Sequence, residues 1–233
     1  MMPQGGGTTI GMTETRDYPG AGVFVPESAS LTTLAEAARG CRGCELYLPA
    51  TQTVFGAGPP SARIVLVGEQ PGDVEDRRGA PFVGPAGRLL DRALDDAGID
   101  RNEAYVTNAV KHFRFTGQPG KRRIHQKPDL SHINACHPWL DAELALLAPE
   151  VVVALGATAA TALIGPAFRV TKQRGQLLPW DGPSGTEDAG VHAGWFVATI
   201  HPSAVLRTQG EGREGAYQGL VSDLRVAATA LAS

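Results

Sequence analysis

Four short runs of apolar, largely β-branched residues recur along the chain, and each run is bounded by turn-forming residues. Runs of this length and composition predict strands that are buried on both faces, as in a parallel sheet. Helical patterns separate the runs, which predicts an α/β fold of three layers (αβα), with helices on both faces of a central four-stranded parallel sheet. The predicted strands are RIVLVGE (63–69), AYVTNAV (104–110), EVVVALG (150–156) and WFVATIH (195–201), and the predicted helices between them span 84–98, 129–148 and 157–165.

Length and composition fit one domain of this class. The chain has 233 residues, of which 42% are hydrophobic and 19% charged, as is ordinary for a globular protein. Residues 1–28 are rich in Gly, Thr and Pro, and we interpret them as a flexible N-terminal arm before a single domain over 29–233. A short helix from Leu31, capped by Ser30 or Thr32, is expected to open the domain.

The sequence contains no apolar run long enough to cross a bilayer, and its first residues lack the apolar core of a secretory signal. We therefore expect a cytoplasmic protein, without a membrane partner, that acts as a monomer.

Polar residues stand where the predicted strands end. Glu69 and Gln70 follow the first strand, Asn108 lies near the end of the second, and His201 closes the fourth. Ligands of parallel α/β sheets bind beyond the carboxyl ends of the strands, so these side chains are expected to line one crevice. Taken singly, each has a simpler explanation. A turn without chemistry accounts for Glu69 and Gln70, and core packing accounts for Phe82 in the next loop.

A basic segment, KRRIH (121–125), is unusual in a chain whose formal net charge is −3. Six Lys or Arg and no Asp or Glu occur between residues 111 and 127. This pattern predicts a local anion site rather than a surface coated in cations. Two interpretations stay open at this point: a solvated loop with His125 directed to water, or a loop that holds His125 against a negatively charged partner.

The three cysteines are too few for the disulfide framework of a small secreted protein. The motif CRGC (41–44) is more typical of half of a metal site, and Cys136 is a further candidate ligand. An exposed thiol pair that binds no metal is the simpler alternative.

Taken together, these motifs resemble the uracil-DNA glycosylase superfamily, in particular its iron–sulfur-containing family 4. The KRRIH segment makes the chain more similar still to the UdgX-type proteins, which bind uracil in DNA and become covalently attached to it. The similarity extends from about residue 24 to 230. It rests on GEQPG (68–72), PFVGPAG (81–87), TNAVKH (107–112), HPS (201–203) and the cysteines.

The resemblance implies a [4Fe–4S] cluster bound by Cys41, Cys44, His112 and Cys136. His112 stands where family 4 has a cysteine, and imidazole can replace thiolate on cluster iron. Three Cys and one His are also a normal zinc set, so composition alone leaves zinc as an alternative. His137, beside Cys136, is interpreted as structural.

The resemblance also implies roles in uracil recognition, base release and capture of the sugar. The expected partner is uracil-containing DNA, single-stranded and double-stranded, with the target base turned out of the stack. The implied roles are stacking on uracil by Phe82, pairing with its edge by Asn108, a further uracil contact by Gln70, stabilisation of the departing base by His201, attack on the sugar by His125, assistance to that attack by Glu69, and phosphate contacts by Lys121, Arg122, Arg123 and Arg207.

Two other functions remain compatible with the sequence. One is a family 4 glycosylase that turns over many times, and the other is a non-catalytic DNA-binding module with a structural metal. The histidine in the basic segment favours covalent attachment over repeated turnover. The polar residues at the strand ends favour an enzyme over a non-catalytic DNA-binding module.

Overall fold

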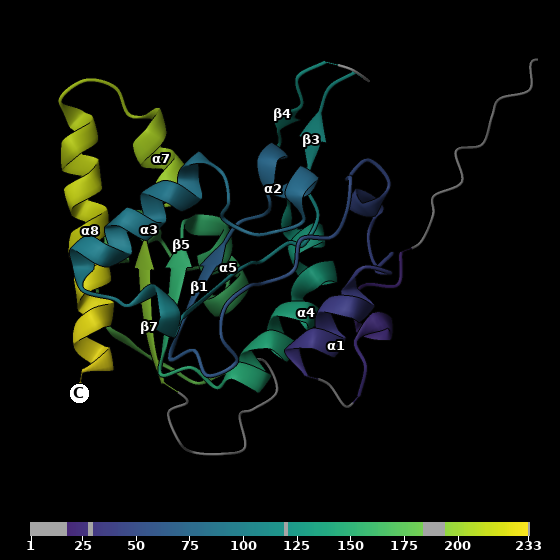
Figure 1. The fold of residues 1–233 in the computed structure, drawn as a ribbon, viewed down its shortest axis with the longest axis horizontal. Helices are drawn as coiled ribbons and strands as arrows, with labels where there is room; N and C mark the ends of the chain where they lie inside the picture. Colours follow the sequence, from purple (N-terminus) through teal and green to yellow (C-terminus); the bar gives the residue numbers. More distant parts are fainter. Residues whose placement is uncertain (1–17, 28–29, 119–120, 184–193, 233) are drawn as a thin grey trace, which may run out of the picture.

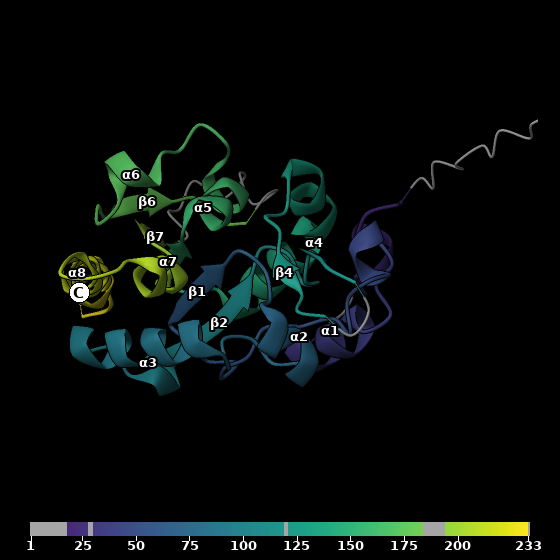
Figure 2. The same cartoon turned by 90° about the horizontal axis from the view of Figure 1, so that it is seen from above.

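A five-stranded sheet lies between two layers of helices in the computed structural model, which describes residues 18–27, 30–118, 121–183 and 194–232 (Figure 1, Figure 2). The strands follow one another across the sheet in the order β2-β1-β5-β7-β6. Their bounds are β1 (Ile64–Gly68), β2 (Ala104–Asn108), β5 (Val151–Leu155), β6 (Leu178–Trp180) and β7 (Gly194–Thr199).

The four predicted strands and their parallel pairing are confirmed. In the centre of the sheet, Ile64 of β1 stands beside Ala104 of β2 and Val151 of β5. The fifth strand, β6, pairs antiparallel with β7 at the sheet edge and was not predicted. It has only three residues, one of them Pro179, and so carries too little of a strand pattern to be recognised.

Alternate residues of each strand face opposite helix layers, as the pleat requires. On β1, Ile64 and Leu66 pack with α3 and α8, whereas Val65 and Val67 face the layer that contains α1, α4 and α5 (Figure 2). The α-helices are α1 (Leu31–Ala38), α2 (Asp73–Arg78), α3 (Pro85–Ala97), α4 (Leu130–Leu147), α5 (Ala157–Ile164), α6 (Val170–Gln173), α7 (Pro202–Arg207) and α8 (Gly212–Leu231).

The three helices predicted between the strands are present as α3, α4 and α5, within a residue or two of their expected ends. Ser30, one of the two expected caps, accepts a hydrogen bond from the backbone N–H of Thr33 and begins α1. The longest helix, α8, was not predicted, although Tyr217, Leu220 and Leu224 form a buried stripe at helical spacing.

Residues 18–27, which belong to the predicted arm, are packed against the domain. Ala21 is buried, its backbone N–H donates to the carbonyl of Ala135 in α4 at 2.7 Å, and a short 3₁₀ helix (Gly22–Phe24) follows. Most of the predicted arm, residues 1–17, lies outside the described residues. Within the described part of the chain, no helix has both the length and the apolarity to cross a membrane.

The connection of the strands predicts where a ligand binds. The chain passes from β1 to β2 on one side of the sheet and then returns to place β5 on the other side of β1. The loops beyond β1 and β5 therefore diverge, and the gap between them is the usual ligand site of such sheets. A two-stranded hairpin of β3 (Phe115–Thr116) and β4 (Ile124–His125) stands above this edge (Figure 1).

A buried ion pair fixes the end of β2. The Nζ of Lys111 lies 2.5 Å from Oε2 of Glu143, and it also donates to Thr107 Oγ1 and to the carbonyl of Asn108, both at 2.7 Å. All three ammonium protons are thereby satisfied. Glu143, in α4, also accepts hydrogen bonds from the Tyr105 and Thr107 hydroxyls. The network ties β2 to α4 directly behind Asn108.

We expect Lys111→Met to lower the free energy of unfolding by about 3–5 kcal/mol, because it leaves the Glu143 carboxylate buried without a counter-charge. The double variant Lys111→Met/Glu143→Leu removes both charges and should recover part of that loss. Urea unfolding of the wild type, both single variants and the double variant measures the coupling. Strictly additive losses would show that the two charges do not stabilise each other.

Candidate active site

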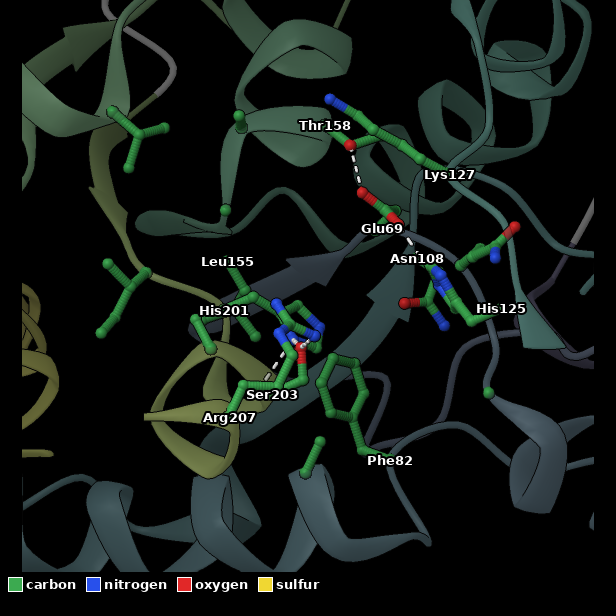
Figure 3. Close-up of a pocket in the computed structure, with 18 of the residues that line it drawn as sticks. Glu69, Phe82, Asn108, His125, Lys127, Leu155, Thr158, His201, Ser203 and Arg207 are labelled. Atoms are coloured by element: carbon green, nitrogen blue, oxygen red, sulfur yellow. Dashed lines mark hydrogen bonds and ion pairs between the residues drawn. The ribbon is translucent and has the colours of Figure 1, made fainter. Parts of the chain in front are cut away.

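A cavity of about 680 Å³ opens at the carboxyl ends of β1, β2, β5 and β7 (Figure 3). The structure brings Glu69, Asn108 and His201 together there, from three different strand ends, as the sequence predicted. His125 reaches the same cavity from the β3–β4 hairpin. These four residues lie far apart in the sequence and line the same cavity.

One wall of the cavity is aromatic. The ring of Phe82 lies nearly parallel to the imidazole of His201, with 6.1 Å between the ring centroids and 27° between the planes. Phe82 has a φ of +55°, which is rare for a bulky residue and shows that its neighbours hold it in place. A Cβ on Gly87 would lie 1.5 Å from the Phe82 carbonyl oxygen, so only glycine lets α3 approach this strained turn.

Asn108 forms the floor beside Phe82. Its side chain is almost fully buried from solvent, and a Cβ on Gly68 would lie 2.4 Å from its Oδ1 and 2.7 Å from the Phe82 ring. The glycine that ends β1 therefore leaves the space in which the amide and the ring stand side by side. A carboxamide offers both a donor and an acceptor, which suits a planar ligand with complementary groups on one edge.

His201 presents an N–H to the cavity. Its Nδ1 accepts a hydrogen bond from the Ser203 backbone N–H at 3.1 Å and lies 2.8 Å from the Ser203 hydroxyl, to which Arg207 donates at 3.1 Å. A neutral imidazole whose Nδ1 accepts carries its proton on Nε2. Burial lowers the pKa of His201 to about 4, and nearby Arg207 and His125 add to the effect. The ring is therefore a neutral hydrogen-bond donor at neutral pH.

Glu69 stands between a threonine and His125 (Figure 3). Its Oε2 accepts a short hydrogen bond from the hydroxyl of Thr158, which lies in the first turn of α5. Its Oε1 lies 3.3 Å from Nε2 of His125, whose side chain is 50% exposed. The carboxylate is thus oriented by one partner and directed at the other. Thr158 was missed by the sequence analysis, although it stands two residues after the end of the third predicted strand.

The basic segment is divided by the structure into two exposed cations and one largely enclosed cation. Lys121 and Arg122 are exposed. The Arg123 side chain is only 13% exposed, and its guanidinium pairs with the carboxylates of Asp73 and Asp76 in α2. These ion pairs hold the hairpin to α2, and the predicted contact of Arg123 with DNA stays a prediction.

Gln70 makes hydrogen bonds within the protein, and its predicted contact with a ligand stays a prediction. Its side-chain amide donates to the carbonyls of Arg114 and Gln126 and accepts from the backbone N–H of Arg114, at 3.0 to 3.1 Å. Gln70 lines the cavity, but its polar atoms are engaged with the hairpin. Arg207 is exposed at the opposite rim, where its phosphate contact stays a prediction.

Comparison with known proteins identifies the fold family. A family model described as the uracil DNA glycosylase superfamily matches residues 55–225. The chain belongs to the uracil-DNA glycosylase superfamily. It is 37% identical over 177 residues to a type-4 uracil-DNA glycosylase of Thermotoga maritima, covering 76% of this chain and 83% of that protein. It is 34% identical over 179 residues to a type-4 enzyme of Pyrobaculum aerophilum, covering 76% and 85%.

A type-5 uracil-DNA glycosylase of Thermus thermophilus is 37% identical over a shorter stretch of 127 residues, covering 48% of this chain and 53% of that protein. The similarity thus extends to a second type within the superfamily.

The candidate cluster ligands are buried. Cys41, Cys44 and Cys136 are each less than a tenth exposed, and the backbone N–H of Lys111 donates to Cys136 Sγ at 3.2 Å. The pKa of Cys136 is raised to about 12, chiefly by burial, with Lys111 opposing and the other two thiols adding to the rise. Burial likewise raises the pKa of Cys44 to about 11, with a contribution from Cys41. Three buried thiols are the type of donor that an iron–sulfur cluster takes.

His112 fits as the fourth ligand. It is buried, lines a cavity of about 230 Å³ together with Cys41, and has a pKa lowered by burial to about 4, so it is neutral as a metal ligand must be. His137 has both ring nitrogens engaged, with Asp141 at 2.9 Å and the carbonyl of Ala162 at 2.8 Å. No three His, Cys, Asp or Glu side chains of the described residues converge as a single ion requires.

Purified protein should be yellow-brown and contain about four iron and four sulfide per chain, because thiolate-bound iron absorbs visible light. His112→Cys should retain the colour, since thiolate is the commoner ligand, and Cys136→Ala should lose it together with stability. His137→Gln is the matched control on the same helix and should keep the cluster. Colourless protein with stoichiometric zinc would contradict the ligand assignment.

His201 should remain neutral in the folded protein down to about pH 4. Its ordinary pKa is about 6.5, so the unfolded chain takes up this proton at higher pH than the folded protein. The stability that neutral His201 contributes is therefore complete above about pH 6.5 and is lost as the pH falls toward about 4. An NMR titration, with His201→Asn to assign the signals, measures the pKa. A His201 signal that titrates near 6.5 would refute the enclosed, neutral ring.

Proposed function

We propose that this protein recognises uracil in DNA, cleaves the uracil N-glycosidic bond, and becomes covalently linked to the resulting sugar through His125, as part of uracil-DNA repair. The observation that carries the proposal is the 3.3 Å distance between His125 Nε2 and Glu69 Oε1. The same cavity contains Asn108 and His201. A nucleophile with a carboxylate partner thus stands opposite groups suited to hold and release a base.

Recognition requires the base outside the helix, because neither its edge nor the glycosidic carbon is accessible in the stack. In the proposal, uracil stacks on Phe82 and pairs with the Asn108 amide, which donates to a uracil carbonyl and accepts from the ring N–H. Cytosine has these donor and acceptor positions exchanged, so the amide discriminates against it.

In this proposal, neutral His201 assists the departure of the base. The glycosidic bond breaks with both electrons leaving on uracil, so negative charge develops on a uracil oxygen. The Nε2 proton of His201 donates to that oxygen as the charge grows, in the manner of an oxyanion hole. The donor is already oriented by Ser203, so little reorganisation is needed at the moment of reaction.

In this proposal, His125 captures the sugar. The ring nitrogen with the free lone pair forms a bond to the electron-poor sugar carbon, and the proton of the other ring nitrogen passes to Glu69. The product is a neutral substituted imidazole, which leaves poorly because it would depart as an anion. The bond therefore persists. Thr158 supports this step by fixing the other oxygen of Glu69.

Contact with the DNA backbone is assigned to the exposed cations around the cavity. Lys121 and Arg122 lie on the hairpin and Arg207 on the opposite rim, so they can meet phosphates on both sides of an extruded nucleotide. Single-stranded and double-stranded uracil-DNA are both proposed substrates. A [4Fe–4S] cluster bound by Cys41, Cys44, His112 and Cys136 would brace the segment beside this surface.

A second candidate is a glycosylase that hands the sugar to water and turns over many times. The type-4 names of relatives up to 37% identical favour it. The two functions share the pocket and differ only in what captures the sugar carbon. The two functions are therefore separated by measuring whether the sugar carbon bonds to the protein or to water.

Wild-type protein incubated with uracil-containing single-stranded DNA should give an adduct that survives boiling in detergent, because a covalent bond does not depend on the fold. His125→Ser should lose the adduct, release uracil repeatedly and leave abasic DNA, since water enters the vacated space. A denaturing gel and an assay of free uracil measure the two outcomes.

Ile124→Ser is the matched control, because Ile124 is the exposed neighbour of His125 in the same strand and receives the same replacement. It should still form the adduct. A wild type that releases uracil without any adduct would favour the multiple-turnover enzyme. An adduct that persists in His125→Ser would assign the nucleophile to another residue.

A further inference from the structure

We infer that Thr53 is a positioning residue for the candidate cluster: its hydroxyl accepts the Nε2 proton of His112 and so leaves Nδ1 as the ring nitrogen that binds iron. The inference rests on the cluster ligands named in the proposed function and not on its uracil chemistry. It adds to those ligands a residue that does not itself bind iron.

The direction of this hydrogen bond follows from the single proton of the Thr53 hydroxyl. Thr53 Oγ1 donates to the carbonyl of Ala38 at 2.9 Å and lies 2.9 Å from Nε2 of His112. A carbonyl can only accept, so the hydroxyl proton is used there, and the imidazole must donate in the second bond. His112 therefore carries a proton on Nε2, and its lone pair for a metal is on Nδ1.

Thr53 is held beside His112 by the backbone. The N–H of Val54 donates to the carbonyl of Lys111 at 2.8 Å, which joins the segment before β1 to the segment after β2. His112 is buried, and the cavity of about 230 Å³ that it lines is also lined by Thr53 and Cys41. The hydroxyl thus has a fixed place in the wall of the candidate cluster site.

The Ala38 carbonyl connects this hydrogen bond to a second candidate ligand. Ala38 is the last residue of α1, where carbonyls lack partners within the helix. Its carbonyl accepts from the backbone N–H of Cys41 at 3.0 Å as well as from the Thr53 hydroxyl. One series of hydrogen bonds therefore runs from Cys41 through Ala38 and Thr53 to His112, and it links two candidate ligands that lie far apart in the sequence.

The hydrogen bond should strengthen His112 as a ligand. Donation from the second ring nitrogen orients a metal-binding imidazole and raises its basicity. Thr53 is the only hydrogen-bond partner of the His112 ring among the residues that the structure describes. Without the hydroxyl, the buried Nε2 proton has no acceptor and the ring is less firmly held. A less basic ligand stabilises oxidised iron less, so the reduction potential of the cluster should rise.

The test compares the wild type with Thr53→Val, which keeps the shape of the side chain and removes the hydroxyl, in protein isolated with its cluster. Release of iron to a ferrous chelator, followed by the loss of visible absorbance, should be about tenfold faster in Thr53→Val. The midpoint potential from a redox titration should be higher than that of the wild type. Thr53→Ser retains the hydroxyl and should keep both values near those of the wild type.

Thr51→Val is the matched control. Thr51 lines the same cavity, but its hydroxyl accepts from Arg123 at 3.1 Å and not from a candidate ligand. Its iron release and midpoint potential should match those of the wild type. The His112→Cys background gives a second comparison, because a thiolate ligand has no proton to donate to Thr53. Adding Thr53→Val to His112→Cys should therefore change neither value.

Iron release from Thr53→Val at the wild-type rate overturns the inference. An equally large effect of Thr53→Val in the His112→Cys background also overturns it, because the hydroxyl would then support the turn at Ala38 rather than the imidazole. Protein isolated without iron contradicts the cluster assignment and the inference with it. These measurements contain no DNA, so their outcome is independent of whether the protein forms an adduct with uracil-DNA.

Discussion

Lys111 and Glu143 meet inside the protein, where neither side chain reaches water. Removing two charges from water is costly, and the cost is offset only where every proton and lone pair finds a partner. Here hydroxyls and a backbone carbonyl complete the pairing. Lys111 donates from its Nζ to the carbonyl of Asn108 and from its backbone N–H to the sulfur of Cys136. One residue therefore contacts both the cavity residue Asn108 and a candidate cluster ligand.

Two histidines face one cavity, and their surroundings differ. His201 is enclosed by Phe82 and fixed by Ser203, so it stays neutral and donates. His125 is half exposed and meets a carboxylate that can take its proton. Under the proposed function, His201 stabilises the departing base and His125 reacts with the sugar that the base leaves behind. The first residue stands at the end of the main sheet and the second on the hairpin.

The sequence predicted the parts of the fold that carry a local signal. The central strands are continuous apolar runs, and α3 and α4 carry apolar stripes and recognisable ends, so both could be predicted. α8 was not predicted, although it has a similar stripe at Tyr217, Leu220 and Leu224. β6 has no such signal, because its three residues become a strand only by pairing with β7.

The site could be predicted where strand ends determine it and not where tertiary contacts do. Glu69, Asn108 and His201 meet because parallel strands end at one edge. The partners of Arg123 and Gln70 could not be deduced from the sequence. Arg123 stands in a run of basic residues and Gln70 follows a strand, and neither pattern indicates whether the side chain faces solvent, a ligand or another loop. Only the position of the hairpin relative to β1 and α2 decides between these.

The hairpin joins the domain through side chains, whereas the sheet is held by its own backbone ladder. An appendage attached in this way can be altered, shortened or exchanged during evolution without rebuilding the frame beneath it. Under the proposed function, a lineage could pass between an enzyme that survives its reaction and a protein consumed by it through changes confined to one loop. Ancestral and hybrid proteins that differ only in this loop would record that passage.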